Sequence, residues 1–134
     1  NCKTQNKEGE VYGTDDASRS GLLLKGQSDS FRFQIFQGKD YRITICNEEM
    51  LGNTINFQIR DFDSDALLYD NKDYNYEKVF EFTCLTSRTV KIVVMIPSDN
   101  NTITTSSIGI NPKPTQMGCV GVLIESMVTP KKGF

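Results

Sequence analysis

Three aspartates alternate with other residues at the end of a predicted strand, at Asp61, Asp63 and Asp65. Carboxylates at alternate positions open the calcium loop of EF-hand proteins, because oxygen ligands suit a hard cation. The rest of that motif is missing, since Ala66 and Lys72 stand where the loop needs Gly and Glu. Two aspartates in the next turn are candidates to complete an irregular calcium site; the alternative is that all of them occupy the solvent face of a strand end and turn. The predicted ligands are Asp61, Asp63, Asp65, Asp70 and Asp73.

The segment that follows combines tyrosines with amide and carboxylate side chains. Flat aromatic rings beside such groups are typical of sugar-binding surfaces. The chain has no tryptophan, which sugar platforms often use, so the alternative is a turn whose amphipathic rings lie at a sheet edge. The predicted ligand-binding residues are Tyr69, Asp70, Asn71, Tyr74 and Tyr76.

Neither catalysis nor nucleic-acid binding is indicated. The chain contains no histidine, and we find no nucleophile elbow, Ser-x-x-Lys motif or phosphate-binding glycine loop. Pairs such as Asp61 and Glu81 arise by chance among 17 acidic residues. The formal net charge is -2 and the lysines are scattered, so no basic field is present to hold a phosphate backbone. We predict that the protein is not an enzyme.

Four cysteines lie at positions 2, 46, 84 and 119, without CxxC spacing. Disulfides explain them better than a dispersed four-thiolate zinc site. Cys46 closes a predicted strand and Cys119 opens one, so antiparallel neighbours would bring them to the same end of a sheet. We predict the pairs Cys46 with Cys119 and Cys2 with Cys84. A chain that opens at Asn1 also fits a secreted protein whose signal peptide has been removed, or a trimmed chain.

Alternation of apolar and polar residues predicts the strands that must position these groups. The strongest pattern runs over 31–36 and 41–46 with a glycine between them, and predicts a hairpin; a second hairpin is predicted over 78–84 and 89–96. The near-continuous apolar run Cys119 to Met127 predicts a strand covered on both faces. Shorter strands are predicted near Val11 and at 22–24, 54–61, 66–69 and 107–110, and residues 47–53 form at most one helical turn.

These elements predict a single all-β domain over residues 1–134, with a polar leader at 1–20 and a tail at 129–134. Its expected architecture is an antiparallel two-sheet β-sandwich of jelly-roll type with about seven to nine strands. No run reaches the roughly 18–20 apolar residues of a membrane helix, so no membrane span is expected.

The segment from Phe31 to Ile45, followed by Phe57-Gln-Ile-Arg-Asp and Leu67-Leu-Tyr-Asp, resembles bacterial pre-peptidase C-terminal domains and related secreted jelly-roll modules. The C-terminal segment from Cys119 to Pro130 resembles the corresponding segment of uncharacterised secreted bacterial proteins. The resemblance implies an exported, non-catalytic β-sandwich, sometimes dependent on calcium or able to bind carbohydrate.

Together these observations predict a non-catalytic module, secreted or held in the periplasm or at the cell surface. It would bind an extracellular glycan or surface protein through residues 61–76, with calcium as the one cofactor to consider. The alternative is a structural or assembly protein that offers a sheet edge to a protein partner, through the strand from Cys119 to Met127 or through the leader.

Overall fold

The computed structural model describes residues 12–14, 18–98 and 117–129, and the statements below concern these residues. The elements are β1 (Gly13–Thr14), β2 (Arg19–Leu24), β3 (Ser28–Ile35), β4 (Lys39–Asn47), η1 (Glu49–Leu51), β5 (Asn56–Asp61), β6 (Leu67–Asp70), η2 (Asn71–Tyr74), β7 (Val79–Thr83), β8 (Arg88–Met95) and β9 (Met117–Val128). η1 and η2 are single 3-10 turns, as the short stretch at 47–53 predicts for the first. The predicted strands near Val11 and at 107–110 lie outside the described residues.

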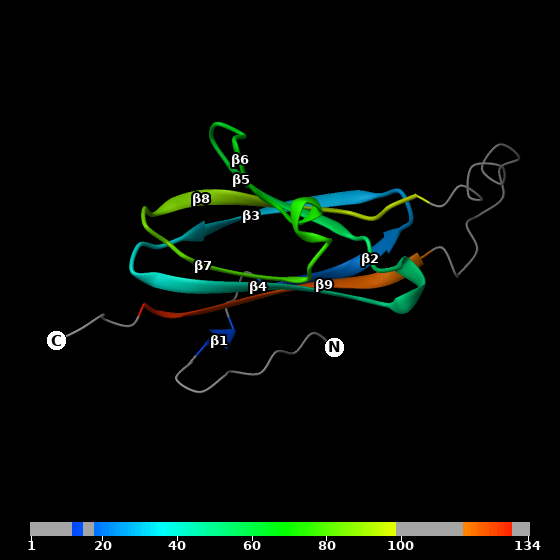
Figure 1. Cartoon of the computed structure of the whole chain (residues 1–134), viewed down its shortest axis with the longest axis horizontal. Coiled ribbons are helices and arrows are strands. Elements are labelled where there is room, and N and C mark those ends of the chain that lie inside the picture. The colour runs from blue at the N-terminus through cyan, green and yellow to red at the C-terminus, as the bar shows by residue number, and fades with distance from the viewer. Residues whose placement is uncertain (1–11, 15–17, 99–116, 130–134) are drawn as a thin grey trace, which may run out of the picture.

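The strands form two layers, as Figure 1 shows. Sheet A has the order β1, β9, β4, β7, with β2 also paired to β9, and sheet B has the order β3, β8, β5, β6. Every described pair is antiparallel. The prediction of an all-β, antiparallel two-sheet sandwich is therefore confirmed.

Both predicted hairpins are wrong. β3 pairs with β8 in sheet B, whereas β4 pairs with β7 and β9 in sheet A, so the turns after β3 and after β7 each cross between the sheets. The two crossings lie side by side, since Gly38 N donates to Cys84 O and Cys84 N donates to Lys39 O. The hydroxyl of Tyr41 accepts a hydrogen bond from Phe36 N at 2.9 Å and stabilises the first crossing. Among the described strands, β5 and β6 are the one consecutive pair that forms a hairpin.

The final strand is central in sheet A. β9 pairs with β4 along one side and with β1 and β2 along the other. Val120, Val122 and Ile124 on the inner face of β9 are buried, whereas Gly121 and Leu123 on its outer face are only partly buried, so the expected full coverage of both faces is not observed. Because β9 is paired along both sides, it has no free edge for strand addition, and the expectation that it offers one is wrong. In the described part of the chain, sheet A ends at β7, at the edge away from β1 and β2. Sheet B ends at β6, at the edge away from β3.

The core fills the space between the sheets with alternate residues of each strand. Ile43 and Ile124 from sheet A and Phe57, Val90 and Ile92 from sheet B are completely buried. Each such side chain stabilises the fold by about 1.5–3 kcal/mol relative to exposure. The apolar periodicity of the sequence thus specifies which face of each strand points inward.

The outer face of sheet A carries a buried ion pair. Register places Arg42 on β4 directly opposite Glu125 on β9 and Glu81 on β7. Arg42 Nε lies 2.8 Å from Glu125 Oε1, and its Nη1 lies 3.7 Å from Glu81 Oε2. The guanidinium also lies 4.3 Å from the ring centroid of Tyr12. Only 4% of Arg42 and 7% of Glu125 is exposed, so neither charge is solvated by bulk water.

Replacing one member of this pair should therefore destabilise the protein. Arg42→Met leaves the Glu125 carboxylate buried without the Nε hydrogen bond, and we expect a loss of about 3–5 kcal/mol in the free energy of unfolding. The double variant Arg42→Met/Glu125→Leu removes both charges and should recover most of that loss. Urea unfolding of the three proteins measures this, and equal destabilisation of the single and double variants would contradict it.

Candidate functional site

Among the predicted aspartates, Asp61 ends β5, and Asp63 and Asp65 lie in the turn that connects β5 to β6, which projects beyond sheet B (Figure 1). Asp70 and Asp73 lie further along the chain, in β6 and η2. Asp61 accepts hydrogen bonds from Ser64 N at 2.9 Å and from Ser64 Oγ at 3.0 Å. Its backbone N–H donates to Ala66 O, and its carbonyl accepts from Asp65 N. The N–H and hydroxyl of Ser64, followed by the charge of Arg88, lower the pKa of Asp61 below its ordinary value. Asp61 is therefore used to close the turn.

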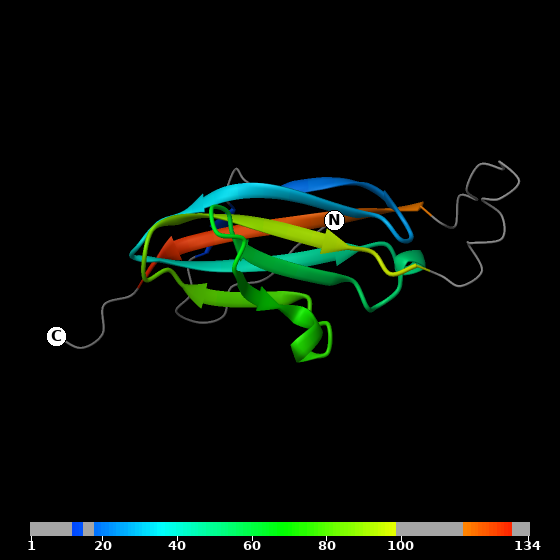
Figure 2. The same cartoon turned by 90° about the horizontal axis from the view of Figure 1, so that it is seen from above.

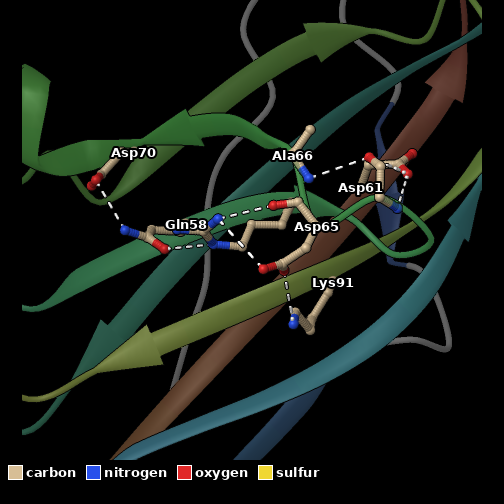
Figure 3. Close-up of polar contacts among 8 residues, drawn as sticks. Gln58, Asp61, Asp65, Ala66, Asp70 and Lys91 are labelled. Atoms are coloured by element: carbon tan, nitrogen blue, oxygen red, sulfur yellow. Dashed lines mark hydrogen bonds and ion pairs between the residues drawn. The ribbon is translucent and has the colours of Figure 1, made fainter.

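Asp65 points along the outer face of sheet B, where Figure 3 shows it beside Lys91. Its carboxylate lies 3.1 Å from Lys91 Nζ and 3.9 Å from Arg60 Nη1, and Arg60 Nη1 also donates to Asp65 O at 3.0 Å. The residue has φ 60°, a left-handed conformation that Asp tolerates better than most residues. The turn thus directs one carboxylate at two cations.

Asp70 lies at the other end of β6. It accepts hydrogen bonds from Asn56 at 2.6 Å, Gln58 at 3.0 Å and Lys72 N at 3.0 Å. Desolvation raises its pKa, but these hydrogen bonds outweigh desolvation, so the pKa of Asp70 lies below its usual value. Asp70 also caps η2 through the bond from Lys72 N.

The predicted metal ligands are not brought together. Asp61 bonds to Ser64, Asp65 faces cations and Asp70 bonds to amides on β5. No group of three or more His, Cys, Asp or Glu among the described residues is arranged to hold a metal ion. Calcium binding through Asp61, Asp63, Asp65, Asp70 and Asp73 stays a prediction from the sequence.

The predicted sugar platform is divided between buried and exposed residues. Tyr69 is 7% exposed, stacks on Phe80 with ring centroids 3.7 Å apart, and donates from its hydroxyl to Glu77 Oε1 at 2.8 Å. Burial, and then the bond to Glu77, raise the pKa of Tyr69 far above its ordinary value, so the phenol stays protonated. Tyr74 stacks on Tyr69 at 5.5 Å but is 57% exposed, and Tyr76 is half-buried.

Asn71 is completely buried. Its Oδ1 accepts from Phe57 N at 2.9 Å and from Asn56 Nδ2 at 2.8 Å. Its Nδ2 donates to Ile55 O and to Glu77 O, each at 3.0 Å. All of its amide groups are used within the fold, so Asn71 is a structural residue and is not available to a ligand.

The accessible residues of this segment are mainly apolar. We define the exposed apolar set as Phe62, Leu67, Leu68 and Tyr74, which are 42%, 48%, 45% and 57% exposed. Three of them were missed as candidate binding residues in the sequence, where Leu67 and Leu68 read only as part of a strand. The sequence feature that could have identified them is a pair of adjacent leucines in a strand of four residues, because adjacent side chains in a strand point to opposite faces and one of the two would face outward.

The cysteine pairings differ from the prediction. Cys84 and Cys119 are free thiols, whereas Cys46 is disulfide-bonded. Cys46 pairs with Gly121 in register, so Cys119 lies one diagonal step away on the same face. Diagonal Cα atoms are about 7–8 Å apart, beyond the usual range for a disulfide. Both predicted pairs, Cys46 with Cys119 and Cys2 with Cys84, are therefore wrong.

The two free thiols differ in their surroundings. Cys84 is buried and its thiol contacts Thr86 O at 3.3 Å. Cys119 is exposed, and its N–H donates to Glu48 Oε1 at 2.7 Å. A hydrogen bond to Glu48 raises the pKa of the Cys119 thiol, which lowers its thiolate fraction.

No known family model matches the chain, and no curated protein matches it in sequence. Among solved structures it is similar to Aeromonas hydrophila PliG, a periplasmic lysozyme inhibitor of g-type lysozyme, with 10% identity and a TM-score of 0.54 over 92% of this chain and 93% of that chain. The Salmonella Typhimurium PliG structure has 15% identity and a TM-score of 0.47 over 92% of this chain and 95% of that one. The Aeromonas match shows a shared fold. The resemblance to pre-peptidase C-terminal domains stays a prediction.

The role of Asn71 can be tested by stability. Asn71→Ala leaves the buried Phe57 N–H and Ile55 carbonyl, and the partly buried Glu77 carbonyl, without their partner. We expect it to lower the free energy of unfolding by about 2–4 kcal/mol. Asn53→Ala, at an exposed position, is the matched control and should change it by less than about 0.5 kcal/mol. Denaturant titration measures both, and similar values for the two variants would refute the structural role.

Asp70 gives a pH dependence with a defined sign. Because its folded pKa is depressed, its contribution to stability is full above the unfolded pKa of about 4 and is lost as the pH falls through the lower folded value. Asp70→Asn should therefore be less stable than the wild type near pH 7, and the gap should shrink towards about pH 2. Urea unfolding of both proteins across this range measures the gap, and a gap independent of pH would contradict the assignment.

Proposed function

We propose that this chain is a non-catalytic, extracytoplasmic domain that binds a protein partner through the segment from the β5–β6 turn to η2. The observation that carries the proposal is the exposed apolar set, whose four large side chains stand 42–57% exposed within 13 consecutive positions, 62–74. Surface apolar groups gathered in one region mark protein interaction sites, and aromatic and aliphatic anchors supply most of the affinity of such interfaces.

The polar chemistry of the segment supports a protein partner over a glycan. A sugar needs accessible amide and carboxylate groups beside a ring face. Asn71 uses its amide inside the fold, Asp70 is occupied by three hydrogen bonds, and Tyr69 is buried. Tyr74 alone among these residues offers a largely exposed ring, which is too little for a sugar platform.

The position of β6 also supports a protein partner. Among the described strands, β6 and β3 are the two edges of sheet B, and β6 pairs only with β5 there. An edge strand can extend its sheet with a segment of another protein, and alternate side chains then give specificity. Leu67 and Leu68 stand on this edge. The sequence-based alternative placed edge-strand binding at β9, which is central in sheet A. We propose β6 as the edge strand instead.

An extracytoplasmic location is supported by the disulfide at Cys46, because structural disulfides persist in oxidising compartments. The similar Aeromonas protein is described as periplasmic. No helix in the described ranges is long and apolar enough to cross a membrane. The non-catalytic role rests on the sequence, which lacks histidine and recognisable catalytic motifs.

The test is site-specific photo-crosslinking in an extracytoplasmic extract of the source organism. A benzophenone side chain placed at position 68 or 74 should give a discrete protein adduct, whereas the same group at position 22, an exposed leucine on β2, should not. Leu68→Ser and Tyr74→Ala should each lower the affinity for the captured partner at least about tenfold.

Purified g-type lysozyme is the first partner to examine, because the Aeromonas protein is described as its inhibitor. Retention on polysaccharide without any protein adduct would overturn the proposal.

A further inference from the structure

Three cations stand in one row across the outer face of sheet B. Register places Arg32 on β3 directly opposite Lys91 on β8, and Lys91 directly opposite Arg60 on β5. Residues that are directly opposite on antiparallel strands point to the same face of the sheet. We call Arg32, Lys91 and Arg60 the cationic row. Arg32 is exposed and the other two are partly exposed, so all three side chains reach solvent.

The cationic row has little internal neutralisation. Like charges directly opposite each other destabilise a sheet, so such a row is usually balanced by carboxylates. Among the described residues, Asp65 alone is ion-paired with it, at 3.1 Å from Lys91 Nζ and 3.9 Å from Arg60 Nη1. Arg32 forms no ion pair in the described ranges and lies 5.4 Å from the ring centroid of Phe62. One carboxylate, itself 63% exposed, thus balances three cations.

The side chains around the cationic row indicate which kind of partner it would bind. Phe62 lies beneath Arg32, and Leu67 is directly opposite Arg60, so two members of the exposed apolar set flank the row. Cations alone would suit any polyanion, whereas cations bordered by exposed apolar side chains suit an acidic protein surface. The planar guanidinium groups also match the geometry of a carboxylate.

We propose that the cationic row binds a carboxylate-bearing segment of the protein partner, and that Asp65 occupies part of this site in the free protein. This inference rests on the proposed function and adds the chemistry of the partner. Asp65 sits on an exposed turn, and its ion pairs with Lys91 and Arg60 are of the weak surface kind. A carboxylate of the partner therefore competes with Asp65 for the same two cations, and Arg32 supplies a third.

The experiment is an NMR titration of the folded, isotope-labelled protein with poly-L-glutamate. Shift changes should map to β3, β8 and β5 around the row. Arg32→Gln/Lys91→Gln should lose at least about tenfold in affinity, whereas Lys39→Gln/Lys72→Gln, with the same change in net charge at positions outside the row, should lose much less. Asp65→Asn removes the competing carboxylate and should bind about two- to fivefold more tightly.

Three results would overturn the inference: equal losses in the row and control variants, weaker binding by Asp65→Asn, or dextran sulfate binding as tightly as poly-L-glutamate at the same residues. Unfolding curves of each variant verify that it is folded. The proposed function is judged separately by the adducts at positions 68 and 74. A captured protein whose affinity depends on Leu68 but not on Arg32 or Lys91 would leave that function standing and refute the carboxylate site.

Discussion

The crossover from sheet B to sheet A depends on one buried amide. The chain leaves β6, forms the single turn η2 and enters β7 in the other sheet, and Asn71 stands at the start of that turn. Its side chain bonds to the backbone of Ile55 and Phe57 on one side and of Glu77 on the other. A 3-10 turn of four residues has too few internal hydrogen bonds to fix its own position. The Asn71 amide therefore sets where β6 ends, where β7 begins and how Tyr74 is presented.

Aromatic stacking extends this constraint along the same side of the sandwich. Tyr74 stacks on Tyr69 and Tyr69 on Phe80, which takes the contact from sheet B to sheet A. Phe80 stacks on Phe82, and Phe82 on Tyr41 at 5.5 Å. Figure 2 shows β6, η2 and β7 together along this side. Because the inner rings are fixed by packing, the outer residues Leu68 and Tyr74 stand on a frame that loses little entropy when a partner binds.

The sequence specifies the strands but not their partners. Alternation from Phe31 to Ile45 identifies β3 and β4 and the faces they bury, because burial depends on the residues themselves. A glycine turn between two alternating segments is compatible with a hairpin within one sheet or a crossing between two. The choice is made by distant strands, since β8 pairs with β3 and β9 pairs with β4. The same limit applies to the site. The spacing of Asp61 and Asp65 is visible in the sequence. The hydrogen bonds from Ser64 to Asp61 depend on the conformation of the turn, however, and the ion pair between Lys91 and Asp65 depends on the position of β8.

The outer faces of sheets A and B differ in the exposure and neutralisation of their charged side chains, and this difference limits where an acidic partner can bind. On the outer face of sheet A, Arg42 and Glu125 neutralise each other in a buried pair and Tyr12 packs on the guanidinium, so the accessible charge of that row is the Glu81 carboxylate, which is negative. On the outer face of sheet B, the equivalent row of Arg32, Lys91 and Arg60 is open to solvent and under-neutralised. A chain with a net charge of -2 therefore concentrates positive charge on one face, next to an edge strand that carries exposed leucines. Long-range attraction of an acidic partner and short-range apolar contact would then act on the same side of the molecule, which is how interfaces combine rapid association with specificity.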